Sequence, residues 1–193
     1  MLANMRVIAG THRGRRLNAP RTDHLRPTSD RVREALFSIL GNRLTNSRFL
    51  DLYAGTGAVG IEAVSRGAIH VTSVESDREA LKLLQRNVQI CQIGDELTMR
   101  PQAVEKFLCN PDQWNGPYDI VFADPPYSDA QEFSALLSEP QTERLFHVDS
   151  WLVIEHATRT TLPVSLGPTQ FLRRYRYGDT TLSVYSSPHA VQR

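Results

Sequence analysis

The stretch "FLDLYAGTGAVGIEA", residues 49–63, decides the fold of this chain. Its first residues, Phe49–Leu52, predict a short buried strand, and its last residues favour a helix. Between the two lie Gly55, Gly57 and Gly60, in the spacing G-x-G-x-x-G that is typical of a dinucleotide-binding turn. The stretch therefore predicts a strand, a glycine loop and a helix that together form a cofactor-binding unit.

The same alternation of strands and helices continues along the chain. The expected strands are Phe49–Leu52, His70–Val74, Leu97–Arg100, Asp119–Ala123, Trp151–His156, Phe171–Tyr177 and Thr180–Ser186. The expected helices are Ala58–Arg66, Asp77–Cys91, Ala103–Leu108 and one near Ala130–Leu137. Alternating strands and helices indicate parallel β-α-β units, and the last two strands, joined by "YGDT", indicate a hairpin. The prediction is an α/β, Rossmann-like, doubly wound and mostly parallel sheet with one antiparallel strand near the C-terminus.

Two further elements are expected before the glycine loop. "MRVIAGTHRGRRLN", residues 5–18, predicts a small β-hairpin, and "TSDRVREALFSILGNRL", residues 28–44, predicts an amphipathic helix. We expect residues 1–47, the basic hairpin and helix, to belong to the same domain as the cofactor-binding part, residues 48–193. The first four residues are expected to be an extension.

The composition is ordinary for a globular protein that buries a core, because 40% of the 193 residues are hydrophobic and 22% are charged. No apolar stretch approaches the roughly 20 residues of a membrane span, and the N-terminus lacks the pattern of a signal peptide. Cys91 and Cys109 are too few for a disulfide framework or a structural metal site. We expect a cytoplasmic monomer with no metal and no membrane partner.

Charge is distributed unevenly, although the net charge is +1. Residues 1–48 hold ten Arg and three acidic residues, a net +7, whereas the remaining 145 residues hold twelve basic and eighteen acidic residues, a net −6. Arg suits phosphate groups and stacks on bases, so the basic segment favours a nucleic-acid partner. A solvated basic face without a partner is the alternative that charge alone leaves open.

Three acidic residues, Asp51, Glu75 and Asp124, come at the ends of expected parallel strands. Ligands of doubly wound sheets bind beyond the carboxyl ends of the strands, so the three are expected on one rim. Glu75 stands about 20 residues after Gly55, where an acidic residue meets ribose hydroxyls. The glycine spacing suits a nicotinamide, a flavin or S-adenosyl-L-methionine. Asp51 favours S-adenosyl-L-methionine, because its sulfonium and ammonium are cationic, whereas a pyrophosphate would avoid a carboxylate.

The strand Asp119–Ala123 runs into "ADPPY", residues 123–127. Two prolines fix the backbone and donate no hydrogen bonds. Asp124 and the carbonyl group of Pro125 are therefore two acceptors at a set separation, and Tyr127 is placed to stack on a base. Two such acceptors can hold the hydrogens of an exocyclic amine, whose nitrogen must leave the plane of the ring before it attacks a methyl group. The motif therefore indicates a site that methylates an amine.

These motifs resemble those of known enzymes. "ADPPY" is similar to the catalytic motif of amino-group methyltransferases, and "FLDLYAGTGAVGIEAVSRGA" is similar to their cofactor loop. With "RPTSDRVREALFSIL" and "YGDT", in this order, the chain resembles the bacterial RsmD-type methyltransferases, which modify the N2 amine of a guanine in small-subunit ribosomal RNA. The resemblance covers Met5 to about Ser186. It implies S-adenosyl-L-methionine as cofactor, guanine 966 of 16S ribosomal RNA as target, and an assembled or assembling 30S particle as substrate.

The resemblance also implies a set of site residues. Those expected to hold the target base are Asp124, Pro125, Pro126 and Tyr127. Those expected to bind the cofactor are Asp51, Tyr53, Gly55, Gly57, Glu75, Gln102, Ala103, Thr28 and Arg33. Those expected to meet RNA are Arg13, Arg15, Arg16, Arg26 and Arg31. One position departs from the family pattern, since Gln102 stands where an Asp usually accepts from the adenine amino group. The carbonyl oxygen of a Gln can accept the same bond.

Three other functions remain open at this point. "DPPY" also serves adenine-N6 methyltransferases that act on DNA or RNA, although 193 residues leave little room for a separate DNA-recognition domain. A nicotinamide-dependent dehydrogenase is disfavoured by Asp51 and by the lack of a convincing catalytic His or Tyr-Lys pair. A non-catalytic RNA-binding module would explain the arginines alone.

Overall fold

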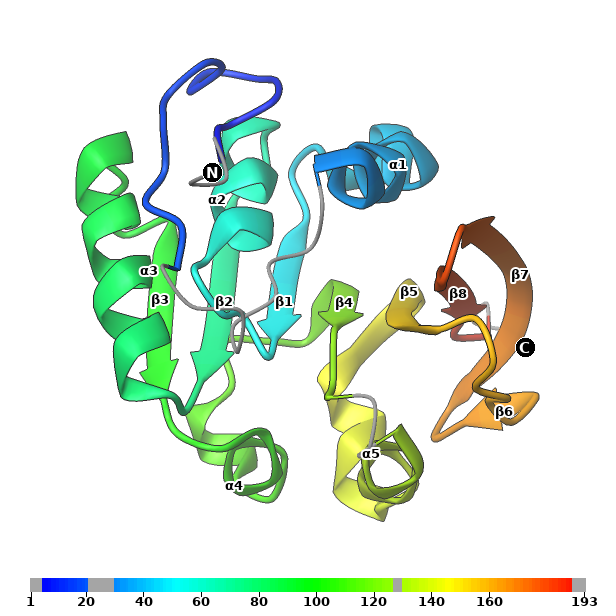
Figure 1. The fold of residues 1–193 in the computed structure, drawn as a ribbon. Helices are drawn as coiled ribbons and strands as arrows, with labels where there is room; N and C mark the ends of the chain where they lie inside the picture. Colours follow the sequence, from blue (N-terminus) through cyan, green and yellow to red (C-terminus); the bar gives the residue numbers. More distant parts are fainter. Residues whose placement is uncertain (1–4, 21–29, 127–129, 189–193) are drawn as a thin grey trace.

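The computed structural model describes residues 5–20, 30–126 and 130–188, so the predicted site residues Arg26, Thr28 and Tyr127 lie outside it. Its centre is an eight-stranded sheet in the order β3-β2-β1-β4-β5-β8-β7-β6 (Figure 1). The strands are β1 (Arg48–Leu52), β2 (His70–Glu75), β3 (Leu97–Pro101), β4 (Tyr118–Ala123), β5 (Phe146–Ala157), β6 (Ser165–Leu166), β7 (Thr169–Tyr177) and β8 (Thr180–Ser186).

The strand directions confirm the predicted, mostly parallel sheet. The strands from β1 to β5 pair in parallel, whereas β8 runs antiparallel to β5 and β7 runs antiparallel to β8. The structure adds β6, a two-residue strand antiparallel to β7 that the sequence did not predict. It also starts β5 at Phe146 rather than at Trp151, with an irregularity in the pairing to β4 between these two residues.

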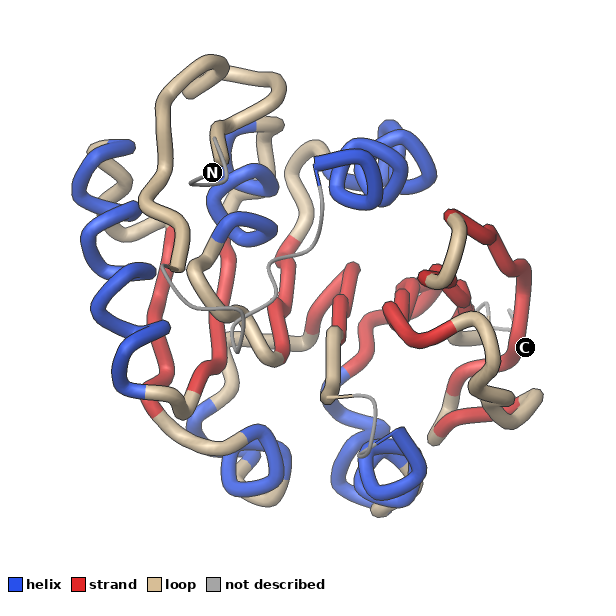
Figure 2. Tube along the Cα trace, in the orientation of Figure 1, coloured by secondary structure: helices blue, strands red, loops and turns tan. Residues whose placement is uncertain are grey.

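Helices cover both faces of the sheet (Figures 1 and 2). They are α1 (Asp30–Leu40), α2 (Ala58–Ser65), α3 (Arg78–Cys91), α4 (Val104–Leu108) and α5 (Ala130–Leu137), with 3₁₀ turns η1 (Gly41–Leu44), η2 (Pro111–Gln113) and η3 (Pro140–Leu145). One buried cluster includes Leu36, Ile61 and Leu84 from α1, α2 and α3, and the other includes Phe107 and Phe133 from α4 and α5. Every helix in the described ranges is too short to cross a membrane as an apolar span.

The helix that follows β2 shows how local sequence positions the edge of the sheet. Asp77 caps α3, because its side chain accepts a hydrogen bond from the backbone amide of Ala80 at 2.8 Å. The helix ends where Gln92 adopts the left-handed conformation, with a φ of 56°. A firm start at Asp77 fixes the short connection to β2, and with it the position of Glu75.

Residues 5–18 fold back into an antiparallel pair, as predicted, but the pairing is too short to form two strands: the backbone amides of Val7 and Leu17 donate to the carbonyl oxygens of Arg15 and Met5, both at 2.9 Å. Arg6 and Arg16 make a single antiparallel bridge, and Figure 2 shows the segment as a loop. The reason lies on α2, where the carboxylate of Glu62 accepts hydrogen bonds from the backbone amides of residues 8 and 9, at 2.7 and 2.9 Å. These amides are thereby bound to a helix rather than to a partner strand.

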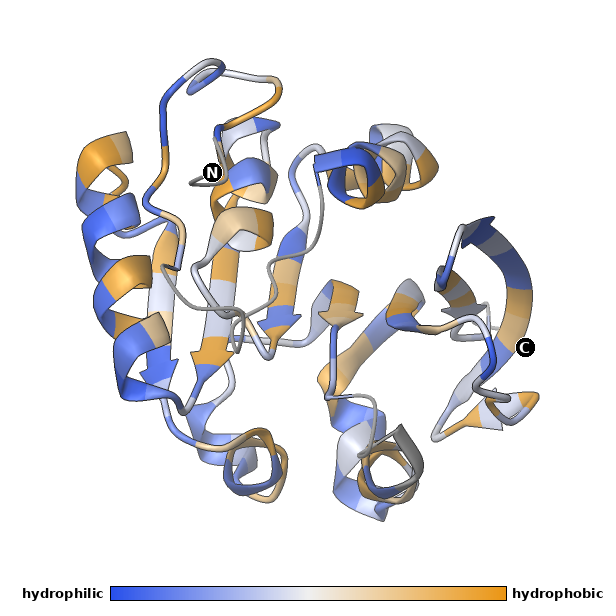
Figure 3. Cartoon of the chain, viewed as in Figure 1, coloured by the Kyte–Doolittle hydropathy of each residue, from blue (hydrophilic) through white to orange (hydrophobic). Residues whose placement is uncertain are grey.

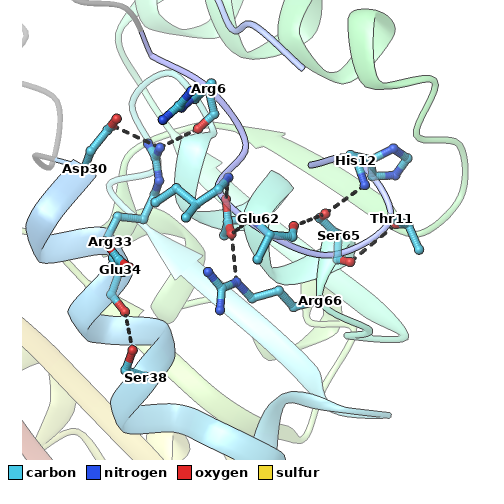
Figure 4. A network of polar contacts seen from close by, with 12 residues as sticks. Arg6, Thr11, His12, Asp30, Arg33, Glu34, Ser38, Glu62, Ser65 and Arg66 are labelled. Carbon is cyan, nitrogen blue, oxygen red and sulfur yellow. Dashed lines mark hydrogen bonds and ion pairs between the residues drawn. The ribbon is translucent and has the colours of Figure 1, made fainter. Parts of the chain in front are cut away.

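The turn of this segment is fixed against the C-terminal end of α2 (Figure 4). Gly10 has a φ of 83°, and a Cβ there would lie 1.8 Å from the carbonyl oxygen of Ser65, so the position requires glycine. The backbone amide of Thr11 donates to the same carbonyl oxygen at 2.8 Å. The N-terminal loop therefore packs on the helices of one face and not on the sheet edge beyond Asp124.

Candidate active site

The carboxyl ends of β1, β2 and β4 are neighbours, and the three predicted acidic residues lie there. Asp51 on β1 stands opposite Ser73 of β2, Glu75 ends β2, and Asp124 follows β4. The charges of Asp124 and Glu75 both act on Asp51. The structure therefore places the three carboxyl groups at one edge of the sheet. Within the described ranges, no group of three or more His, Cys, Asp or Glu is arranged to hold a metal ion.

The glycine loop uses backbone conformations that favour glycine. Gly55 and Gly57 have φ values of 55° and 76°, and a Cβ on Gly57 would lie 2.8 Å from Cγ of Leu84. Tyr53 also has a positive φ, of 61°, and its ring packs edge-on against Phe133 with 5.9 Å between the ring centres. The loop turns the chain so sharply that α2 begins at the edge where β1 ends, which is the usual place for a ligand to meet free backbone amides.

Glu75 ties the glycine loop to the end of β2. Its Oε2 accepts a hydrogen bond from the backbone amide of Gly55 at 2.7 Å, and its Oε1 accepts from the amides of Ser76 and Asp77 at 2.8 Å. A carboxylate offers about four acceptor positions, so about one remains after these three bonds. Glu75 therefore holds the loop in place and keeps an acceptor for a ligand hydroxyl.

Asp51 points into the molecule. It is 1% exposed, and its Oδ2 accepts a hydrogen bond from the backbone amide of Gly60 at 3.0 Å. Burial raises the pKa of Asp51 to about 8; the Gly60 amide lowers it, and the charges of Asp124 and Glu75 raise it further. In the absence of a nearby cation the carboxyl group therefore keeps its proton at neutral pH.

Gly60 is what makes room for this carboxyl group. A Cβ on Gly60 would lie 3.2 Å from Oδ2 of Asp51 and 2.8 Å from Oγ of Ser73. The third glycine of the fingerprint thus serves close packing of α2 on β1 and β2, as such a glycine does in dinucleotide-binding turns.

The segment after β4, residues 124–127, is called the elbow below, and the structure describes it as far as Pro126. The backbone amide of Asp124 donates to the carbonyl oxygen of Leu52 at 3.4 Å, which continues the pairing of β4 with β1 by one residue. Asp124 is half-buried, Pro125 is buried and Pro126 is exposed. The segment therefore leaves the sheet beside the glycine loop, with the carboxyl group of Asp124 at the point of exit.

Gln102 and Ala103 lie between β3 and α4, at the same edge. Gln102 is half-buried, and its side-chain nitrogen donates to the side-chain oxygen of Gln113 at 2.5 Å. This bond turns the amide so that the carbonyl oxygen of Gln102 remains as the acceptor that the resemblance requires. Ala103 is exposed and precedes the first residue of α4.

Arg33 is the largest buried polar side chain, and it comes from α1. It is 0% exposed, and its Nη2 donates to the carbonyl oxygen of Arg6 and to Oδ1 of Asp30 (Figure 4). Its Nε and Nη1 have no hydrogen-bond partner among the described residues. Burial lowers the pKa of the Arg33 guanidinium, and Asp30 and Glu62 raise it. A buried guanidinium with two nitrogens to spare, which carry three N–H groups, is suited to an anionic ligand.

The described arginines predicted to meet RNA do not gather at this edge. Arg13, Arg16 and Arg31 are exposed, and Arg15 is half-buried. Arg15 donates from Nη1 to the carbonyl oxygen of Ile90, near the C-terminal end of α3. Because α2 and α3 run back from the carboxyl edge, residues 10–15 lie at the opposite end of the sheet, as Figure 1 shows. Their contact with RNA stays a prediction.

One acidic residue near the site was missed by the sequence analysis. Glu155 on β5 is 6% exposed. Ala123 of β4 is paired with Ile154 of β5, so the next residues along the two strands, Asp124 and Glu155, are neighbours. The signal was available, because an acidic residue inside the apolar run "WLVIEHA" is unusual for a buried strand. Glu155 is a candidate second carboxylate of the target site.

Comparisons with known proteins point to one family. The chain matches the family model described as conserved hypothetical protein 95 over residues 5–186. It is 33% identical over 181 residues to the "Putative rRNA methyltransferase YlbH" of Bacillus subtilis (strain 168), which covers 94% of this chain and 98% of that protein. It is 38% identical over 151 residues to the "Ribosomal RNA small subunit methyltransferase D" of Escherichia coli (strain K12), which covers 78% of this chain and 71% of that protein.

Solved structures give the same picture. The "Putative methyltransferase yhhF" from Escherichia coli superposes with a TM-score of 0.80 at 29% identity, over 95% of this chain and 98% of that one. An RNA methyltransferase from Salinibacter ruber in complex with S-adenosyl-L-homocysteine shares the fold, with a TM-score of 0.62 at 16% identity over 86% of this chain and 95% of that one.

The strand order, the glycine loop and the acidic edge define a Rossmann-like methyltransferase. The family model spans most of the chain, and the relatives named above align with it over most of their own length. The chain therefore belongs to the family of RsmD-type ribosomal RNA methyltransferases.

Proposed function

We propose that the protein transfers a methyl group from S-adenosyl-L-methionine to the exocyclic N2 amine of a guanine in small-subunit ribosomal RNA, with guanine 966 of 16S ribosomal RNA as the target. The observation that supports this most strongly is the position of Asp124. It leaves β4 in a proline-fixed segment, beside the glycine loop and Glu75. An amine bound to Asp124 would therefore lie next to a cofactor bound to the loop. Family membership supports the substrate class.

The residues at the edge fit S-adenosyl-L-methionine. Glu75 keeps about one acceptor position for a ribose hydroxyl, and Gln102 keeps a carbonyl oxygen for the adenine amine. Nε and Nη1 of Arg33, which have no partner among the described residues, suit the carboxylate. Asp51 lies where a nearby cation would favour its ionised form. When bound, the cofactor supplies a methyl group activated by a sulfonium.

The elbow prepares the amine for transfer. The lone pair of an exocyclic amine is delocalised into the ring, so the nitrogen attacks only when its hydrogens are held and its geometry is drawn toward the tetrahedral. Asp124 and the Pro125 carbonyl oxygen supply two acceptors, and the prolines set their positions before the substrate arrives. As positive charge develops on the nitrogen, the carboxylate of Asp124 stabilises it and can accept the proton that the product releases. Tyr127, outside the described residues, is assigned the stacking contact with the base.

The same elbow would also accept the N6 amine of an adenine, and this is the one alternative that a specific feature, "DPPY", favours. The two purines differ at N1, which carries a hydrogen in guanine and a lone pair in adenine. Glu155, next to Asp124, is a second carboxyl group that could accept the N1 hydrogen of guanine. We expect the enzyme to act as a cytoplasmic monomer without a metal, on RNA in an assembled or assembling 30S particle.

Single-turnover transfer of labelled methyl tests the proposal. The protein would be mixed with labelled S-adenosyl-L-methionine and either naked small-subunit RNA or 30S particles lacking the modification, and the RNA digested to nucleosides. The expected product is N2-methylguanosine, formed faster on particles. Label on adenine N6 would mean that the target is an adenine and not a guanine, and the proposed mechanism would still hold. A lack of transfer to either substrate would contradict the proposed function.

A further inference from the structure

A second basic segment lies at the C-terminal end of the chain. Residues 49–157 hold seven basic and seventeen acidic residues, a net −10. Residues 158–188 hold four basic residues and one acidic residue, a net +3. The four basic residues are Arg159, Arg173, Arg174 and Arg176, and the acidic one is Asp179. Three of these arginines are on β7, so positive charge is concentrated on one strand of the sheet.

Six of the nine residues of β7 are exposed, and Tyr175 and Tyr177 are half-buried. Phe171 and Leu172 are 40% and 50% exposed, and the three arginines of the strand are exposed as well. Figure 3 shows the hydrophilic stretch of β7 against the apolar strands at the centre of the sheet. Among the described residues, none of the three arginines makes an ion pair; the guanidinium of Arg174 lies 5.6 Å over the ring of Phe171. The charges are therefore available to a partner.

Both faces of this strand carry arginine and aromatic side chains. Arg174 pairs with Ser183 and Phe171 pairs with Tyr185, which places both on the face covered by α4 and α5. Arg173, Tyr175 and Tyr177 lie on the other face, where the two tyrosines pack partly against the cluster that includes α1. Partly exposed rings next to arginines can bind unpaired bases and their phosphates.

β7 also ends at the edge of the sheet where Asp124 lies. β7 is antiparallel to β8, which is antiparallel to β5, so β7 runs in the same direction as β4 and β5. Its last residue, Tyr177, therefore lies at the carboxyl edge of the sheet, on the side of β5 away from β4. Thr158, which follows β5, binds the backbone of the turn at residues 178–179. Asp124 lies at the same edge, whereas the loop with Arg13 and Arg15 lies at the opposite one.

We propose that Phe171–Tyr177, which we call the β7 strip, binds single-stranded RNA and guides it to Asp124. The proposal deepens the proposed function and rests on RNA being the substrate. The arginines contact phosphates, and Tyr175 and Tyr177 offer rings to bases. A different explanation for arginines on an exposed strand is that they prevent its edge from pairing with another chain. If the arginines bind RNA, their loss weakens RNA binding; if they protect the edge, their loss leads to self-association.

Two matched variants separate these explanations. The strip variant combines Arg173→Ser, Arg174→Ser and Arg176→Ser, and the loop variant combines Arg13→Ser, Arg15→Ser and Arg16→Ser, so each removes three positive charges. Binding of a labelled single-stranded RNA is measured by fluorescence anisotropy over a series of salt concentrations. Each phosphate contact in a single strand adds about 0.7 to the slope of log affinity against log salt, so the strip variant should lose about 2 from this slope.

We expect the strip variant to bind RNA roughly tenfold more weakly at low salt, to raise KM for RNA with kcat unchanged, and to keep the cofactor affinity of the parent protein. The loop variant should change the slope by less. If the triple variant does not fold, Arg176→Ser alone should lower the slope by about 0.7.

Equal slopes for the parent protein and the strip variant would overturn the proposal, and so would a larger loss in the loop variant. Self-association of the strip variant in gel filtration, with RNA affinity unchanged, would assign the arginines to edge protection and overturn it as well. In each of these cases methyl transfer by the parent protein would leave the proposed function standing. A parent protein that neither binds nor methylates RNA would overturn both the proposed function and the RNA-binding role of the β7 strip.

Discussion

The sheet has two halves that share one carboxyl edge and differ in almost everything else. In the parallel half, formed by β1 to β4, the central strands are enclosed: five of the six residues of β4 are buried. In the C-terminal half, formed by β5 to β8, one of the nine residues of β7 is buried. The glycine loop, Glu75, Asp51 and Asp124 lie in the first half, and the β7 strip lies in the second.

The difference shows how one edge can serve two kinds of ligand. The parallel half offers backbone amides, half-buried carboxyl groups and a loop held by hydrogen bonds, which bind a small cationic cofactor in a way that salt affects little. The C-terminal half offers exposed arginines and rings, whose contacts with RNA weaken steeply as salt rises. Asp124 and Glu155 stand on the two strands, β4 and β5, at which the halves meet. The methyl transfer is therefore expected at the boundary.

The largest effect is expected from a change at this boundary. Asp124→Ala should lower methyl transfer by about 100-fold or more, comparable to the loss of one preorganised group that stabilises charge in a transition state. Its affinity for S-adenosyl-L-methionine should stay within a few-fold, because Glu75 and the glycine loop are untouched. Single-turnover transfer of labelled methyl measures the first quantity and titration calorimetry the second.

Asp124→Asn is the matched control. It keeps an acceptor oxygen and should retain part of the activity. Full activity in the alanine variant would show that the boundary residue takes no part in the chemistry, and the elbow would then have a packing role alone.

A smaller effect concerns the stability of the parallel half. Burial raises the pKa of Asp51 to about 8, well above its value in an unfolded chain. The contribution of Asp51 to the free energy of unfolding should therefore be fully present below pH 4, where both states hold the proton, and should be lost as the pH rises toward 8. Asp51→Asn cannot ionise, so without cofactor it should be more stable than the parent protein by up to about 5 kcal/mol at pH 8.

Urea unfolding of both proteins at pH 5, 7 and 9, without cofactor, measures this difference. The two stabilities should diverge as the pH rises. A difference in the free energy of unfolding that stays constant over the whole pH range would mean that Asp51 is ionised in the folded protein. The acidic edge would then need no cation to offset its charge.

Local rules predicted the parallel half well. Positive φ at Gly55 and Gly57, a cap at Asp77 and a strand that ends at Glu75 are all encoded within a few neighbouring residues.

Contacts between distant residues could not be predicted in this way. The amides of residues 8 and 9 reach Glu62, more than 50 positions away, and this contact keeps the predicted hairpin shorter than two full strands. The β7 strip was overlooked for a different reason. The charge balance was taken over residues 49–193 as a whole, in which the acidic residues of the parallel half hid the arginines near the C-terminus.

The parallel half is expected to bind the cofactor, and the C-terminal half is expected to bind RNA. This division is tested most directly by titration calorimetry with S-adenosyl-L-methionine, at low and high salt, on the parent protein, the strip variant and Glu75→Ala. The parent protein and the strip variant should bind the cofactor equally well at both salt concentrations. Glu75→Ala should bind it at least about tenfold more weakly, because it loses an acceptor for the ribose and the hydrogen bond that holds the glycine loop. An unchanged dissociation constant for Glu75→Ala, or a weakened one for the strip variant, would contradict the account.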